Sequence, residues 1–269
     1  MPADSVSWRI FANPVTLFIG GVAAVILELA EPSVRAGVWN HSSFRSDPLT
    51  RLRRTGAAAM ITVYAPREVA ASMIARVVAL HDKVRGELPD GRPYYANDPR
   101  LLDWVQATAT FGFTEAYHHY AGGLSDRDRS AAFAEGRAAA HLFGATGAPT
   151  SLQEWEALLA RTLPTLEASE TLSEFLQIMR TTPILPGPLR PLQRLLVRAA
   201  VEIVPPRVRE HLGLENSGLR KGERAAVSAL ARLAERIPLP SSPPAQARRR
   251  MRAAPAASAQ PLLSRSREG

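Results

Sequence analysis

Apolar side chains recur at three- and four-residue steps along most of this 269-residue chain, with polar side chains between them. Such spacing is typical of amphipathic helices that bury one side against a core. There is no sustained alternation of apolar and polar residues, and we find no hairpin signature. The pattern therefore predicts an all-α fold.

Proline pairs mark where several of these helices begin. Asn13-Pro14, Asp47-Pro48 and Asp98-Pro99 each put a capping side chain directly before a proline at the first helical position. A further helix is expected to begin at Pro66 and to carry His81. The expected helices include those over about 14–31, 48–60, 66–86, 98–120, 191–204 and 218–236.

The chain divides into one folded domain and a tail. Residues 12–236 hold the helical pattern, and hydrophobic residues make up 46% of the chain, enough for a sizeable core. From residue 238 the composition shifts to proline, alanine, serine and arginine with no apolar periodicity. Such a tail buries too little surface to offset its ordering entropy, so residues 238–269 are expected to be disordered.

The formal net charge of +8 is unevenly distributed along the chain. The tail holds six arginines and one glutamate, which leaves the helical domain with only a small positive excess. Because this domain lacks a concentrated basic face beside stacking aromatic residues, it is not expected to bind nucleic acid. The chain has no cysteine, so thiolate catalysis, cysteine-bound zinc and iron–sulfur clusters are excluded.

The most apolar run, from Pro14 to Leu27, is about 14 residues long, shorter than the roughly 20 that a membrane-spanning helix needs. A run of this length is typical of a buried core helix. The N-terminus carries Asp4 before any basic residue and has no obvious cleavage site, unlike a secretory signal. These features predict a cytoplasmic protein without a membrane span.

His81 stands where a solvent-facing histidine is not expected. An apolar stripe runs along the expected helix, and His81 lies on it, four residues after Val77. The stripe consists of Val69, Met73, Val77 and Leu80. An imidazole that faces a core needs partners for its nitrogens, because a buried unpaired polar group is destabilising. A backbone carbonyl, a carboxylate, a metal ion or a haem iron can each fill that role.

A series of short motifs follows in a fixed order. They are Asp47-Pro48, Arg51 with Thr55, Leu80-His81, Val84-Arg85-Gly86, Asp90-Gly91-Arg92-Pro93-Tyr94, Asp98-Pro99 and Trp104-Val105. In this order of motifs the chain resembles the DUF2236 family, which includes the latex-clearing rubber oxygenases and the mpaB-type oxygenases. The resemblance continues through Glu115-Ala116-Tyr117 to Leu214 and covers residues 12–236.

The resemblance implies a single multi-helix domain with the globin-like core of the rubber oxygenases. It also implies one haem b with His81 as axial ligand of the iron, and the oxidation of a small hydrophobic substrate by dioxygen. Arg51 and Thr55 match an Arg/Thr pair on the polar side of the haem pocket and are the expected catalytic residues. Their spacing of four puts both on one helix face, where a cation and a hydroxyl can stabilise developing negative charge.

Several further residues bear on the expected chemistry. The base that the rubber oxygenases use has two candidates here, Glu28 and Glu31, and spacing does not choose between them. Gln106 follows Trp104-Val105 where many relatives have histidine, and an amide cannot shuttle protons near neutral pH. His118 and His119 are adjacent, so their side chains point about 100° apart and are not expected to chelate one ion.

Two other functions fit the same residues. The first is a non-catalytic helical protein in which Arg51, His81 and Asp90 form a buried polar network. The second is a haem carrier or sensor without turnover. The visible spectrum of protein expressed with a haem supply separates the first of these from the haem-binding functions.

Overall fold

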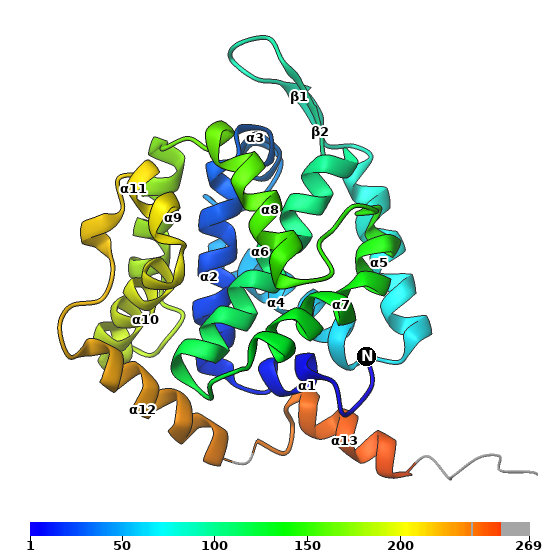
Figure 1. Cartoon of the computed structure of the whole chain (residues 1–269), viewed down its shortest axis with the longest axis vertical. Coiled ribbons are helices and arrows are strands. Elements are labelled where there is room, and N and C mark those ends of the chain that lie inside the picture. The colour runs from blue at the N-terminus through cyan, green and yellow to red at the C-terminus, as the bar shows by residue number, and fades with distance from the viewer. Residues whose placement is uncertain (238, 254–269) are drawn as a thin grey trace, which may run out of the picture.

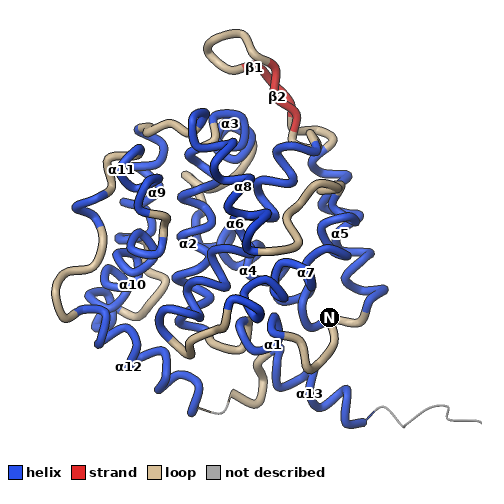
Figure 2. The backbone as a smooth tube through the Cα atoms, in the orientation of Figure 1, coloured by secondary structure: helices blue, strands red, loops and turns tan. Residues whose placement is uncertain are grey.

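Helices form nearly all of the regular structure in residues 1–237 and 239–253, the part of the chain that this computed structural model describes (Figures 1 and 2). The described helices are α1 (Val6–Ile10), α2 (Pro14–Ala30), α3 (Pro32–Asn40), α4 (Pro48–Tyr64), α5 (Arg67–His81), α6 (Pro99–Tyr120), α7 (Asp126–Phe143), α8 (Leu152–Thr162), α9 (Glu170–Thr181), α10 (Arg190–Ile203), α11 (Pro206–His211), α12 (Glu223–Arg236) and α13 (Pro243–Ala253). Two short strands, β1 (Arg85–Glu87) and β2 (Pro93–Tyr95), complete it. The all-α prediction is confirmed.

The central element is α2, which packs against α6 along its length and is flanked by α9, α10 and α12 (Figure 1). Asn13 begins this helix as expected, since its side-chain oxygen accepts hydrogen bonds from the backbone N–H groups of Val15 and Thr16. At the other end the Trp104 indole of α6 donates to the carbonyl of Leu27 at 3.2 Å. The apolar run that sequence analysis assigned to a core helix therefore forms the centre of the core.

Gly20 of α2 and Gly112 of α6 face each other and allow the two helices to approach closely. A Cβ atom added at Gly20 would lie 2.7 Å from both the carbonyl oxygen of Gly112 and the Cα of Phe113. Both neighbouring atoms belong to the backbone, so no side-chain rotation can relieve the overlap. By contrast, a Cβ added at Gly21 would meet only the Phe113 ring, at 3.8 Å, an ordinary van der Waals distance.

Replacement by alanine is expected to have opposite effects on stability at the adjacent residues Gly20 and Gly21. Gly20→Ala forces the backbones of α2 and α6 apart and should lower the free energy of unfolding by about 3 kcal/mol. Gly21→Ala removes backbone freedom without a clash and should raise it by roughly 0.5–1 kcal/mol. Urea denaturation of the two variants measures the difference, and equal stabilities would contradict the assigned helix contact.

The hairpin of β1 and β2 was not expected from the sequence, and it projects from the helical body (Figure 2). The strands are antiparallel, with Arg85 opposite Tyr95. Gly91 supplies the positive φ of 83° that the turn needs, and Asp90 accepts hydrogen bonds from the backbone and side chain of Arg92. Strands of three residues are too short to show an alternating pattern. Because Asp90 is exposed in this turn, the predicted buried network of Arg51, His81 and Asp90 is wrong.

One stretch of the tail is helical, although the sequence predicts disorder there. Residues 243–253 form α13, which packs beside α4 (Figure 1). Ala247 is buried in a small cluster with Trp8, Val63 and Tyr64, and the Arg250 side chain donates to the carbonyl of Tyr64. The small apolar residues of this helix give no amphipathic signal, although they fit closely against aromatic neighbours. Residue 238 and residues 254–269, which share the disorder prediction, lie outside the described residues.

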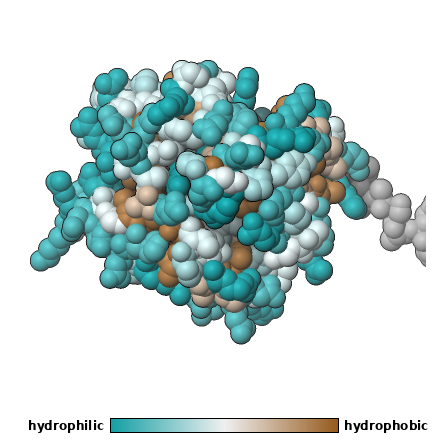
Figure 3. All heavy atoms as spheres, turned by 90° about the horizontal axis from the view of Figure 1, so that it is seen from above, coloured by the Kyte–Doolittle hydropathy of each residue, from teal (hydrophilic) through white to brown (hydrophobic). Residues whose placement is uncertain are grey.

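No single helix in residues 1–237 and 239–253 has both the length and the hydropathy to cross a bilayer. The helix pair α2 and α3 meets those criteria together, and the two helices are bent by 111° at the break between them. Figure 3 shows hydrophilic side chains over most of the face seen from above, with apolar residues in small separate groups.

Candidate functional site

Helix α4 carries the predicted Arg/Thr pair in its first two turns. Asp47 caps this helix by accepting a hydrogen bond from the Thr50 N–H, and Pro48 begins it. The Arg51 guanidinium donates to the Thr55 hydroxyl oxygen at 2.8 Å, and that hydroxyl donates to the Arg51 carbonyl at 3.0 Å. The spacing of four thus joins a cation and a hydroxyl into one unit. The Nε of Arg51 is buried and has no hydrogen-bond partner.

Helix α5 ends at His81, several residues earlier than the sequence pattern predicts. Its buried residues are Met73 and Ile74, whereas Val69 is 50% exposed and Leu80 is 62% exposed. The inward face is therefore shifted by about one residue from the predicted stripe, and His81 still lies on it. The imidazole is half-buried, and its Nδ1 atom is buried without a hydrogen-bond partner.

The residues after the hairpin hold the end of α5 in place. One carboxylate oxygen of Asp82 accepts hydrogen bonds from the Asn97 amide and from the Tyr95 hydroxyl, both at 2.8 Å. Asn97 also donates to the carbonyl of Val78 at 3.1 Å. We call these contacts the Asp82 clamp. They fix the last turn of the helix and with it the position of His81.

The imidazole of His81 is held in its neutral form. Burial lowers its pKa below the ordinary value of 6.5, and the positive charge of Arg51 lowers it further. The neighbouring Asn97 and Asp82 side chains oppose this shift but do not overcome it. At neutral pH the ring therefore keeps an unprotonated nitrogen, which is the form that binds a metal.

Glu28 lies near the end of α2, and its carboxyl group is strongly perturbed. Burial raises its pKa from the ordinary 4.5 to about 7, although the Arg51 guanidinium acts in the opposite direction. Burial also lowers the pKa of Arg51, and Glu28 opposes that shift. A carboxyl group of this pKa can both hold and release a proton near neutral pH.

The structure distinguishes Glu28 from the other candidate, Glu31. The side chain of Glu31 caps α3, where its carboxylate accepts a hydrogen bond from the Val34 N–H at 2.7 Å. Arg35 and Arg100 are the cations that act on its pKa, whereas Arg51 acts on Glu28. Glu31 therefore has a structural role at a helix terminus. Sequence spacing could not show this, because the charge of Arg51 acts on Glu28 from a separate helix.

The charge of Arg51 links residues of three helices into one candidate site, and the exposed Thr55 belongs to it through its hydrogen bonds to Arg51. The four residues are Glu28 on α2, Arg51 and Thr55 on α4, and His81 on α5. Arg51 shifts the pKa of both Glu28 and His81, so its charge acts on the two titratable groups together. The site combines a proton-exchanging carboxyl, a fixed cation with a hydroxyl, and a neutral imidazole.

The comparison with protein families identifies the chain. Residues 8–237 match the family described as the catalytic domain of ER-bound oxygenase mpaB/B′ and rubber oxygenase. The chain belongs to this family. All four residues of the candidate site lie inside the matched part of the mpaB/rubber oxygenase domain. No curated protein and no solved structure is significantly similar to the chain.

Gln106, which follows Trp104-Val105 and which sequence analysis singled out, lies elsewhere in the structure. It lines a crevice of about 10 Å³ between α6 and α7, together with residues such as Phe133 and Arg137. None of the four candidate site residues lines this crevice. Gln106 is therefore not one of the donors around Glu28 and Arg51.

Three other histidines of this oxygenase-family domain have partners of their own. His41 forms a hydrogen bond of 3.0 Å with the hydroxyl of the buried Tyr94. The Nδ1 atom of His118 accepts a hydrogen bond from the Leu124 N–H, while Nδ1 of His119 accepts one from Arg224. The two adjacent rings bind in different directions, as expected from their positions on a helix.

Proposed function

We propose that this protein is a haem b-dependent oxygenase that oxidises a small hydrophobic substrate with dioxygen. The observation that carries the proposal is the convergence of Glu28, Arg51 and His81 from three helices, with an unpaired buried nitrogen on both Arg51 and His81. A buried polar atom without a partner is destabilising unless something else satisfies it. Membership of an oxygenase family supports the same conclusion.

The residues present fit a haem group. His81 would hold the iron, because a single neutral imidazole is a common axial ligand of haem. Haem supplies the oxidising chemistry when bound, and the protein supplies the ligand and the surrounding charges. The donor set comprises one imidazole, one guanidinium and one carboxyl of pKa about 7.

Each of the other residues has a separate role in the proposed reaction. Arg51, which donates to the Thr55 hydroxyl, would supply a positive charge able to stabilise negative charge on oxygen, and a charge fixed in advance needs no reorganisation during the reaction. Glu28 accepts a proton on its carboxylate oxygen at neutral pH and can return it.

Thr55→Val and Arg51→Lys test this assignment of roles. Both variants should keep the Soret band of bound haem, because neither residue is the axial ligand, and both should lose on the order of 10²-fold in oxygen uptake. Thr62→Val is the matched control, since its hydroxyl also donates to a carbonyl of α4 four residues earlier. The assignment is wrong if the Thr55 and Arg51 variants consume oxygen as fast as the control. Haem binding by the wild type without any oxygen uptake would favour a carrier or sensor.

A further inference from the structure

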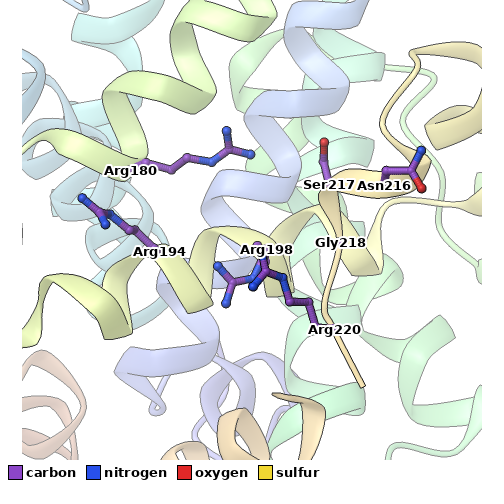
Figure 4. Close-up of a pocket in the computed structure, with 7 residues that line it drawn as sticks. All are labelled: Arg180, Arg194, Arg198, Asn216, Ser217, Gly218 and Arg220. Carbon is purple, nitrogen blue, oxygen red and sulfur yellow. The ribbon is translucent and has the colours of Figure 1, made fainter. Parts of the chain in front are cut away.

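A cavity of about 260 Å³ opens between α9, α10 and the segment that leads into α12. Figure 4 shows its lining side chains, which come from three separate parts of the chain. They are Arg180 of α9, Arg194 and Arg198 of α10, and Asn216, Ser217, Gly218 and Arg220 of the following segment. None of the four residues of the proposed haem site is among them.

The charge of this cavity is strongly positive. Glu223 binds Arg198 through two hydrogen bonds of 2.5 and 3.0 Å and also accepts the backbone N–H of Arg220. Among the described residues, neither Arg180 nor Arg194 has a carboxylate within ion-pair distance. Four arginines line the cavity, and Glu223 neutralises only part of their charge.

A second carboxylate near the cavity, that of Glu202, has hydrogen-bond partners of its own. Glu202 lies close to Gly218, but it accepts hydrogen bonds from Arg209 and from the Leu219 N–H, both at 3.2 Å.

Burial and the charge of Arg198 both lower the pKa of Arg180, so this guanidinium is partly removed from water and repelled by its neighbour. An arrangement of like charges in a hollow is unfavourable by itself and is relieved by a bound anion.

We propose that this cavity binds a phosphate group, free or carried by a small phosphorylated molecule. Guanidinium groups donate in pairs to phosphate oxygens, and here they approach from three segments of the chain rather than from one flat face. That arrangement suits a tetrahedral anion with several acceptor oxygens. The side chains of Ser217 and Asn216 add neutral donors at the rim.

The size of the cavity agrees with a small ligand. A volume of about 260 Å³ equals that of about nine water molecules at roughly 30 Å³ each. It lies just below the range of about 300–1,000 Å³ typical of drug-sized ligands. A phosphate group with a short organic part can therefore occupy it, while a nucleic-acid strand cannot enter.

Titration calorimetry on the full haem-loaded chain tests this proposal. The probes are inorganic phosphate and glycerol 3-phosphate, with sodium acetate and sodium chloride at equal ionic strength as comparisons. We expect saturable binding of one or both phosphate compounds and no saturable binding of acetate or chloride. Tighter binding of glycerol 3-phosphate would identify a phosphorylated molecule as ligand, and tighter binding of inorganic phosphate would identify the free ion.

Variants locate the binding. Arg180→Gln and Arg194→Gln should each raise the phosphate Kd at least about tenfold, because each removes one charged donor. Arg190→Gln is the control, since this exposed arginine begins the same helix but does not line the cavity. Arg194 is exposed, so its variant stays informative even if Arg180→Gln fails to fold. Equal affinities of the Arg194 variant and the control, or acetate binding as tight as phosphate, would overturn the proposal.

Discussion

Replacing His81 by alanine is expected to abolish the Soret band of the purified protein. The imidazole is the candidate axial ligand, and its lowered pKa keeps it in the binding form at neutral pH. Loss of a residue that merely supports a metal ligand already costs roughly 10- to 100-fold in affinity, so loss of the ligand itself should cost more. Absorption spectra recorded during haemin titration measure the effect.

Two controls make the His81 experiment specific. His141→Ala removes an exposed histidine of α7 and should leave the spectrum unchanged. Added imidazole should restore part of the Soret band of His81→Ala, because the small ring can occupy the space left by the side chain. A wild-type protein that stays colourless and takes up no haemin would contradict the haem proposal.

The pH dependence of haem binding follows from the same pKa. A protonated imidazole cannot bind iron, so affinity falls as pH drops through the pKa of His81. Because burial lowers that pKa, binding should persist below pH 6.5, where an ordinary histidine becomes protonated. A midpoint above 6.5 in a haemin titration series would contradict the assigned environment.

Glu28→Gln is expected to lower oxygen uptake strongly while making the protein more stable at neutral and alkaline pH. Glutamine cannot exchange a proton, and loss of a positioned general base typically costs about 10²- to 10⁴-fold in rate. The stability gain arises because the folded protein holds the Glu28 proton more tightly than the unfolded chain does, with a pKa of about 7 against 4.5.

The sign of this effect depends on pH. Below pH 4.5 the carboxyl is protonated in both states, and wild type and variant should have similar free energies of unfolding. As pH rises to 7 the unfolded chain ionises first, and the wild type loses up to about 3 kcal/mol that the variant keeps. Urea denaturation at several pH values measures the difference.

Glu31→Gln separates the two glutamates. Its side chain caps α3, so the variant should keep oxygen uptake close to that of the wild type. If Glu31→Gln loses activity and Glu28→Gln does not, then Glu31 is the base and the assignment of Glu28 from its raised pKa is wrong.

Local rules predicted those parts of the fold that local residues determine. Asn13-Pro14 and Asp98-Pro99 begin helices because a cap and a proline act within one turn, whatever the rest of the chain does. The hairpin was missed because its strands span three residues each, although Asp90-Gly91 is a turn signal. Helix α13 was missed because its buried residues, Pro244 and Ala247, are too small to mark an amphipathic face.

The site shows the same division between local and long-range information. Arg51 and Thr55 could be paired from their spacing, and the order of motifs singled out His81. The choice of Glu28 over Glu31 needed the position of Arg51 in the folded chain, which leaves no trace in the local sequence. The arginines that line the cavity between α9 and α10 also come from separate segments of the chain, so no short stretch of sequence shows that they lie together.

The Asp82 clamp has a consequence for the order in which the protein assembles. The contact from Asp82 to Asn97 spans only 15 residues. Loops of about ten residues close within roughly 10–100 ns, far faster than the collapse of a whole domain. The turn that holds His81 can therefore form before α2 brings Glu28 into place. The proposed iron ligand is then already presented on a nascent chain whose core has not yet closed.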